Sequence, residues 1–468
     1  MALTSGRSKK TILTRRIRVR YRSVLSCLLA VAALSIQGHA VQAQEQPSLT
    51  GRWVVSADIY GTPVYLRLEL DQQGEQLTGT SNGDTLEGTV NGNSIHFLVK
   101  PSSLMKDGGG GQEELTGTLQ NGVISGTMVW TEGDNPTHPT TVQFTATPAP
   151  ARRAGPAQRF DFTPTVYYSR FSAFNKPVLT VSPGDTIHTT TVDARGVDFA
   201  GVRRALRSGN PQTGPFYIAT AMPGDTLVIH LKRLRLNRDW AISETGIANR
   251  GLNAKLAIAM DRNKDVRWHL DMAKGVASPE DPGEHLAHYF VPIHPMLGCI
   301  AVAPSPSQAT IPDTGDSGAW GGNMDFNEIV EGATVYLPVE SVGALLYLGD
   351  AHAEQGDGEL NDDALETSMD VEFTVDLIPG KHIPYVRVES PTHLIAMGFE
   401  GSLDEAFRTA TANMAQWLKE DYQLTPAEIG EVLGSAAEYK VNEVPDRNAG
   451  IVLKISKERL QTLTPAAK

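Results

Sequence analysis

Short apolar runs separated by turn residues occupy most of the first third of the chain. Residues 64–70 read Val-Tyr-Leu-Arg-Leu-Glu-Leu, an alternation in which every second side chain faces a core. A phrase of Leu or Ile followed by any residue, Gly and Thr recurs at 77–80, 86–89, 115–118 and 124–127. This pattern predicts a small up-and-down β-barrel or sandwich, a β-meander domain over residues 44–147.

The chain between residues 148 and 158 reads as a linker. Prolines at Pro148, Pro150 and Pro156, with small residues between them, prevent a strand or helix from continuing. The second domain, residues 159–468, opens with two Pro-Gly-Asp-Thr phrases at 183–186 and 223–226, each entering a strand. We interpret the aspartates of these phrases as turn formers.

Near the C-terminus the apolar spacing becomes helical. Ser402 with Glu405, and Thr425 with Glu428, mark the starts of two predicted helices. An apolar run at 451–455 predicts a final strand that returns to a sheet. The predicted fold class is therefore mostly β (α+β) with a C-terminal helical pair. The apolar face of the first helix is expected to consist of Leu403, Phe407, Ala410, Met414 and Trp417.

The N-terminal segment is typical of an export signal. A basic stretch at 15–22 precedes thirteen largely apolar residues at 24–36 and a small-residue site ending at Ala43. Thirteen residues are too few to cross a bilayer, which needs about 20. We expect cleavage of residues 1–43, a periplasmic or secreted location and no membrane anchor afterwards. Residues 14–18 weakly match a twin-arginine signal, so both export routes stay open.

Charge and cysteine content narrow the possible partners. Residues 1–43 contain eight basic and no acidic side chains, so the remaining chain has 33 basic against 53 acidic residues and a formal charge of −20. So acidic a protein repels nucleic acid and anionic membrane surfaces, which leaves small uncharged substrates. Cys299 is the only cysteine after the signal, so the mature chain forms no internal disulfide.

The densest chemistry lies at residues 348–359. Asp350 and His352 follow an apolar strand two positions apart, so both project from one face if the strand continues. Glycines at 356 and 358 let the chain turn back and bring Asp357 or Glu359 toward the same point. Such a set binds a divalent metal and leaves a position for water, although a solvated turn explains the same residues.

Ordered segments throughout the second domain resemble the acetamidase/formamidase family. Besides residues 349–359, they include Gly-Asn-Met-Asp at 322–325 and an acid, Asp193, at the end of an early strand. The resemblance starts near Arg159, so residues 1–158 lie outside it. The other matching segments are 213–218, 223–227, 295–304, 366–371, 397–399 and 403–406.

This resemblance implies an often oligomeric β-rich amidase that converts a linear carboxamide to a carboxylate and ammonia. The family's active-site motifs, matched to this sequence, imply that Asn323, Asp325, Asp350, His352 and Glu359 are site residues. Asp193 matches an acid at the end of an early strand of the family and is added to them. We expect a homo-oligomer and a divalent metal cofactor, with zinc as the first candidate.

Our mechanistic hypothesis is that His352, Asp350 and either Asp193 or Asp325 hold the metal. Glu359 then transfers protons, and Asn323 bonds to the substrate amide or oxyanion.

Other interpretations stay open. Cys299 could be a nucleophile, but its apolar strand favours a buried, unreactive thiol. His285 and His288 could bind a second metal, but they lie in a Pro-Gly-flanked loop typical of surface residues. Because residues 361–363, Asn-Asp-Asp, depart from the family pattern, the chain could act on a larger amide, or bind amides without turnover.

Overall fold

The structure is a computed structural model that describes residues 48–59, 61–102, 111–131, 137–205, 209–259, 264–306, 308 and 310–463. The expected signal peptide, residues 1–43, lies outside this range, so its cleavage and the export of the protein stay predictions. Within the described residues, no helix has both the length and the apolar character needed to cross a membrane.

The repeated phrases of the first third form a closed barrel in which each strand pairs with its neighbour and the first strand pairs with the last. Alternating side chains such as Leu66, Leu68 and Leu70 point into its core, where Phe97 and Phe144 join them. The prediction is confirmed in its barrel form. The strands are β1 (Gly51–Ile59), β2 (Thr62–Gln73), β3 (Gln76–Ser81), β4 (Asp84–Asn91), β5 (Ser94–Ser102), β6 (Gly111–Gln120), β7 (Val123–Thr131) and β8 (Thr140–Pro148).

A 12-stranded sheet carries most of the polar segments of the second domain. Its main order is β18-β17-β16-β15-β24-β23-β19-β21-β20, and β13 joins β10 and β11 to β23. The strands are β10 (Tyr167–Tyr168), β11 (Leu179–Val181), β13 (Gln212–Ile218), β15 (Trp240–Glu244), β16 (Asp265–Asp271), β17 (Val276–Pro279), β18 (Val291–Pro292), β19 (Met296–Ala301), β20 (Ser317–Gly318), β21 (Gly321–Asn323), β23 (Leu346–His352) and β24 (Glu366–Thr367).

A second sheet of nine strands has the order β28-β29-β27-β26-β22-β14-β25-β12-β9. Apolar side chains from both sheets, such as Ile229 and Phe373 from this one and Leu297 and Leu348 from the other, form one core. The strands are β9 (Arg159–Asp161), β12 (Thr186–Thr190), β14 (Thr226–Leu236), β22 (Thr334–Pro338), β25 (Met369–Ile378), β26 (Arg387–Glu389), β27 (His393–Glu400), β28 (Glu438–Glu443) and β29 (Ala449–Ser456).

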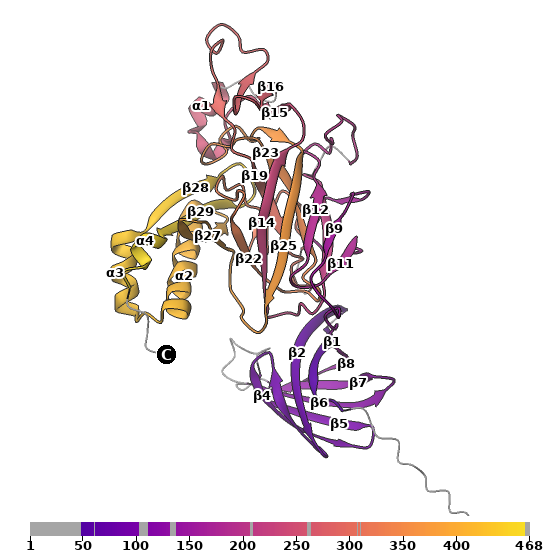
Figure 1. Ribbon diagram of the computed structural model, residues 1–468. Coiled ribbons are helices and arrows are strands. Elements are labelled where there is room, and N and C mark those ends of the chain that lie inside the picture. The colour runs from indigo at the N-terminus through magenta and orange to yellow at the C-terminus, as the bar shows by residue number, and fades with distance from the viewer. Residues whose placement is uncertain are drawn as a thin grey trace, which may run out of the picture. The chain divides into compact units, whose positions relative to one another are not determined.

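The C-terminal helical pair forms where the capping residues predicted it. Helix α2 (Leu403–Tyr422) begins after Ser402, and α3 (Pro426–Ala436) begins after Thr425 with a complete capping box. Helix α2 packs against β27 and β29, beside α3 (Figure 1). Phe407 differs from its prediction, because it is 44% exposed and stacks on Tyr439. The remaining helices of the described residues are α1 (Ala254–Ala259), α4 (Lys457–Leu460) and the 3-10 turn η2 (Asn249–Gly251).

The observed fold confirms the predicted class: mostly β, with an N-terminal barrel and C-terminal helices. The division into domains at residues 148–158 stays a prediction. Strand β23 is buried along its whole length and carries Asp350 and His352 at its end. The fold therefore places these two polar side chains at the edge of the apolar core.

Candidate metal centre and active site

Strand pairing brings distant parts of the sequence together at the end of β23. His352 lies opposite Glu366 of β24 on one side and Met296 of β19 on the other. On the far side of β19, Cys299 pairs with Asn323 of β21. Strands β21, β19, β23 and β24 are therefore adjacent in the sheet, and three of them carry Asn323, His352 and Glu366.

Three groups of side chains among the described residues have ligand atoms close enough to hold a cation, and two of these groups share His352. The carboxylates of Asp325 and Asp350 lie within 4.8 Å of a ring nitrogen of His352, and so do those of Glu359 and Glu366. All five side chains are buried, with residue exposures of 0 to 6%. Carboxylate and imidazole ligands in this number suit zinc and several other divalent metals.

The orientation of the His352 ring is fixed by a chain of hydrogen bonds. The Nε2 group of Gln355 donates to the backbone carbonyls of Asp325 at 2.6 Å and Asn442 at 3.3 Å. The Oε1 atom of Gln355 must then face Nδ1 of His352, 2.9 Å away, and accept its hydrogen. Such an arrangement leaves the Nε2 lone pair of His352 available, as in metal-ligating histidines.

Several ligand atoms of this cluster have no hydrogen-bond partner among the described residues. Nε2 of His352 lies 2.9 Å from Glu366 and 3.5 Å from Asp350 without the alignment of a hydrogen bond to either. Oδ1 of Asp325 and Oε2 of Glu366 also have no partner within that part of the chain. Orphaned buried acceptors are rare and costly, so their meeting at one point fits a bound cation.

Gly298, on β19, leaves the space between the carboxylates open. A Cβ at this position would lie 2.4 Å from both Oδ1 of Asp325 and Oδ2 of Asp350, and 3.0 Å from the His352 ring. Its backbone carbonyl also accepts from the backbone N–H of Asp325 at 3.1 Å. The absence of a side chain at 298 is therefore a requirement of the cluster.

Backbone conformation at the cluster is unusual. Asp325, Asp350 and Glu359 all have positive φ, at 40°, 57° and 47°. A non-glycine residue in this region costs about 1–3 kcal/mol when it is strained, and such residues concentrate at functional sites. Uncommon backbone conformations thus set the direction of all three carboxylates.

Crowding and burial shift the proton affinities of the cluster. Burial, followed by the charge of a neighbouring acid, holds the pKa of Asp325 and Glu359 well above their usual range. Burial also raises the pKa of Glu366 to about 8. Burial lowers the pKa of His352, but Glu366 and Asp350 outweigh it and leave that pKa well above normal. Asp325, Glu359 and Glu366 therefore retain protons that a bound cation would displace.

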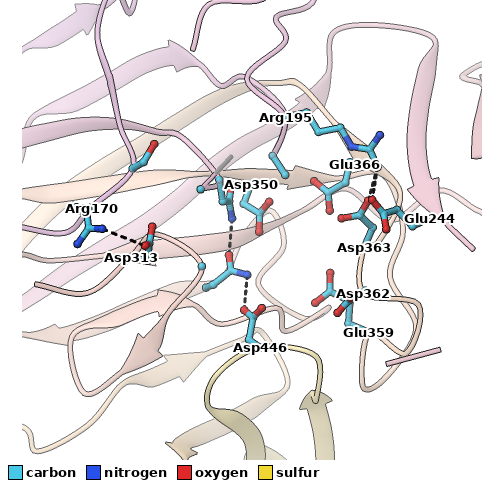
Figure 2. Close-up of a pocket in the computed structure, with 16 residues that line it drawn as sticks. Arg170, Arg195, Glu244, Asp313, Asp350, Glu359, Asp362, Asp363, Glu366 and Asp446 are labelled. Atoms are coloured by element: carbon cyan, nitrogen blue, oxygen red, sulfur yellow. Dashed lines mark hydrogen bonds and ion pairs between the residues drawn. The ribbon is translucent and has the colours of Figure 1, made fainter. Parts of the chain in front are cut away.

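An open cavity of about 710 Å³ lies over the cluster. Asp350, Glu359, Glu366 and Asp446 project into it (Figure 2). At its rim Arg195 pairs with Asp363 at 2.8 Å. Other charged lining residues are Arg170, Glu244, Asp313 and Asp362. A small molecule entering this cavity meets the carboxylate cluster at its base.

The structure brings together five of the six residues proposed from the sequence, and Asp193 is the exception. Its Oδ2 accepts from Arg238 at 2.8 Å, and its Oδ1 accepts from the backbone of Arg195 and Val197. None of the candidate metal groups among the described residues contains it. Asp193 therefore has the partners of a buried ion pair, whereas Glu366, which was not proposed from the sequence, lies opposite His352 and belongs to the cluster.

Removing Arg238 should destabilise the protein strongly. Both Arg238 and Asp193 have side chains only 1% exposed, so Arg238→Met leaves an unpaired buried carboxylate. We expect a loss of about 3–5 kcal/mol in the free energy of unfolding, measured by urea titration. Arg235→Met is the matched control, because its partner Glu331 is exposed and such pairs contribute about 0–1 kcal/mol. Equal losses in the two variants would contradict this account.

Cys299 has the surroundings of a structural residue. It is fully buried on β19 and packs with Phe171 and Tyr347. Burial, then the charges of Asp350 and Asp325, raises the pKa of its thiol well above the ordinary value. A thiol in this state holds its proton at neutral pH and is a poor nucleophile.

If the protein hydrolyses amides, as the family resemblance implies, Cys299→Ala is expected to release ammonia within about threefold of the native rate, because a buried, protonated thiol takes no part in the reaction. Treatment of the native protein with iodoacetamide should likewise leave its rate unchanged. Ammonia release before and after treatment measures both. Complete loss of activity in a folded Cys299→Ala variant would contradict this interpretation and indicate that the thiol is a nucleophile.

Sequence reasoning missed Glu366, Gln355 and Asp446. Glu366 lies in a segment that carries the family resemblance, and this was the available signal. Asp446 comes from the loop between β28 and β29, and it accepts from Asn323 at 2.9 Å. Burial raises the pKa of Asp446 to about 7. His285 and His288, in contrast, are exposed and lie outside the candidate metal groups of the described chain.

The fold and the site together define the class of protein. It is a β-rich protein of two sheets, with a candidate metal centre of buried carboxylates and one histidine under an open cavity. The model of the Acetamidase/Formamidase family matches residues 306–427. The resemblance that the sequence motifs carry is therefore confirmed.

Solved structures with this fold support the same conclusion. A predicted acetamidase/formamidase from Thermoanaerobacter tengcongensis is 26% identical, with a TM-score of 0.57 over 66% of this chain and 99% of that one. An acetamidase from Bacillus halodurans is also 26% identical, with a TM-score of 0.56 over 65% of this chain and 99% of its own.

Sequence relatives are matched over shorter stretches. A protein of Schizosaccharomyces pombe whose name assigns it as a formamidase is 25% identical over 32% of this chain and 47% of its own length. An acetamidase from Mycolicibacterium smegmatis is 43% identical over 15% of this chain and 18% of its own length. The matched region thus spans about half of the first relative and less of the second.

Proposed function

We propose that this protein is an exported amidase that hydrolyses a linear carboxamide to a carboxylate and ammonia with the help of a divalent metal ion. The observation that carries the proposal is the set of unpartnered buried ligand atoms at the base of the cavity. The names of the relatives supply the reaction class. Asp325, Asp350, His352 and Glu366 would hold the metal, with Glu366 in place of Asp193.

The bond to be broken sets the requirements of the site. An amide carbonyl is a weak electrophile, and its nitrogen departs only after it gains a proton. A divalent metal bound at the cluster would polarise the carbonyl and lower the pKa of a water molecule. The protein must then supply a group that moves a proton from water to nitrogen.

Glu359 is the residue suited to this proton transfer. It lines the cavity and is 6% exposed, so a proton on it is shielded from bulk water. Its Oε1 atom accepts from the backbone N–H of Ala364 at 3.1 Å, which fixes the carboxyl and leaves Oε2 for the substrate. Glu359 would accept a proton from the attacking water and deliver it to the departing nitrogen.

Asn323 is better placed to orient neighbouring groups than to donate to an oxyanion. Its Nδ2 hydrogens are used by Asp325 at 2.6 Å and Asp446 at 2.9 Å. Its Oδ1 accepts from Asn210 at 2.8 Å and retains capacity for one more hydrogen. We propose that Asn323 positions the two carboxylates and accepts from the N–H of the substrate amide.

Ammonia release from a series of amides tests the proposed function. The series contains formamide, acetamide and longer primary amides, because acetamide would fill only a small part of a cavity of about 710 Å³. Release from at least one member supports an amidase, and the preferred length identifies the acyl group. Saturable binding without release from any member would instead support an amide-binding protein.

Export and oligomerisation are separate parts of the proposal. The basic and apolar segments before Ala43 support export, and mass spectrometry of the mature N-terminus tests it. A mature chain that retains residues 1–43 would contradict export. Light scattering of the purified protein tests the expected homo-oligomer, which a monomeric mass would exclude.

A further inference from the structure

The cavity over the metal cluster has an acidic lining that restricts which amides can fill it. Eight of its sixteen lining residues are aspartate or glutamate, and two are arginine. Among the described residues, this lining contains no aromatic side chain and no aliphatic one larger than that of Ala194. A substrate that fills about 710 Å³ here must therefore make polar contacts, because the cavity offers no apolar wall for a long alkyl or aryl group.

Both arginines of the lining already have acidic partners. Arg195 pairs with Asp265 at 2.6 Å and with Asp363 at 2.8 Å. Arg170 lies 3.7 Å from a carboxylate oxygen of Asp313. An anionic substrate would have to compete with these acids for each guanidinium and would be repelled by the rest of the lining. The cavity therefore disfavours anionic amides as well as apolar ones, and it favours cations.

Asp362 is the acid of this lining that has no partner of its own. Its residue is exposed, and its carboxylate makes no hydrogen bond or ion pair within the part of the chain that the structure describes. The residues on either side are held in place, since Asn361 donates to the backbone carbonyl of Glu244 at 3.2 Å and Asp363 belongs to the ion pair described above.

The position of Asp362 relative to the chemistry is set by a turn. Its backbone N–H donates to the carbonyl of Glu359 at 3.1 Å, so Asp362 lies beside the residue proposed to transfer the proton (Figure 2). The anchored neighbours and this turn place one unpaired carboxylate in the cavity, next to the point where an amide would be cleaved. A cationic donor on the substrate would give that carboxylate a charge-assisted hydrogen bond.

We propose that the preferred substrate is a primary amide whose acyl chain ends in an ammonium group, and that Asp362 binds this ammonium. The inference rests on the proposed amidase function and adds the substrate class to it. An ammonium has three hydrogens to donate and no acceptor, so it matches a lining of carboxylates. The formal charge of −20 on residues 44–468 also attracts a cation from solution.

Matched pairs of amides test this proposal. Ammonia release from β-alaninamide, 4-aminobutanamide and 5-aminopentanamide is compared with release from butanamide, pentanamide and hexanamide, in which a methyl group replaces the ammonium. In at least one pair, kcat/KM should be about tenfold higher for the amino member, and this preference should shrink at high salt. Equal values in all three pairs, or higher values for the alkyl members, would overturn the proposal.

Asp362→Asn locates the selectivity. It should lower kcat/KM for the preferred amino amide about threefold or more, with the rate on its alkyl partner and the metal content unchanged. Asp357→Asn is the matched control, because Asp357 is a 53% exposed acid of the same segment outside the cavity, and both rates should stay native. Loss of metal in Asp362→Asn, or an equal loss on both amides, would overturn the assignment.

The failure of this inference is distinguishable from failure of the proposed function. If no amide of either series is hydrolysed, the amidase proposal fails, and calorimetric titration with the same pairs still tests the selectivity. Tighter binding of the amino members that disappears in Asp362→Asn would support the inference without turnover. Equal binding of the amino and alkyl members would overturn it.

Discussion

Glu359→Gln is expected to lower kcat for amide hydrolysis by a factor of about 10² to 10⁴ while metal content stays at the native level. The substitution keeps the size of the side chain and the acceptor for the backbone N–H of Ala364, so the fold and cavity should survive. It removes the oxygen that carries the proton. Rate measurements at saturating amide, with metal analysis of the same sample, separate these two effects.

Glu354→Gln is the matched control for this experiment. Glu354 belongs to the same segment but pairs with His294 at 2.7 Å and does not line the cavity over the cluster. Its variant should hydrolyse amides at the native rate. If Glu359→Gln instead loses metal together with activity, Glu359 is a ligand and the proton must move through another group. Full activity in Glu359→Gln would remove it from the mechanism.

Gly298→Ala is expected to lose both metal and activity while remaining folded. A Cβ at 298 would stand 2.4 Å from an oxygen of Asp325 and from one of Asp350, so both carboxylates must move apart. We expect metal affinity to fall by about 10- to 100-fold or more, as when residues that orient ligands are changed. Metal titration followed by ammonia release measures both losses.

Gly356→Ala provides a control glycine in the same region of the sequence. A Cβ there would meet nothing within 4 Å, and the residue has no positive φ. This variant should bind metal and turn over substrate normally. Normal metal binding by Gly298→Ala would show that the cation does not lie among Asp325, Asp350 and His352.

Local patterns in the sequence predict the elements well because their causes are local. Alternation at 64–70 specifies a barrel strand, and the side chains of Ser402 and Thr425 specify the starts of two helices. Phe407 shows the limit of a helical-face argument. Phe407 lies on the apolar face of helix α2, but its neighbour there is Tyr439 of β28, and the two rings do not close into a buried core.

Local spacing also predicts part of the site. Asp350, His352 and Glu359 lie within ten residues, so two glycines suffice to bring them together. Spacing along the sequence could not show which of Asp193 and Glu366 is the metal ligand. Whether a strand-end acid meets a cation or an arginine depends on pairing across the sheet, and Arg238 lies 45 residues from Asp193. The register of β23 with β24, which places Glu366 opposite His352, is equally non-local.

The central claim is that a divalent metal at the Asp325–Asp350–His352–Glu366 cluster is required for amide hydrolysis, and one measurement tests it most directly. Ammonia release is recorded from the purified protein, from the same protein after dialysis against a chelator, and after stoichiometric zinc or another divalent metal is returned. We predict that the rate falls about tenfold or more in the chelated sample, because the metal assists the chemical step. One equivalent of metal should restore the rate. An undiminished rate in a chelated sample shown to be free of metal would contradict the account.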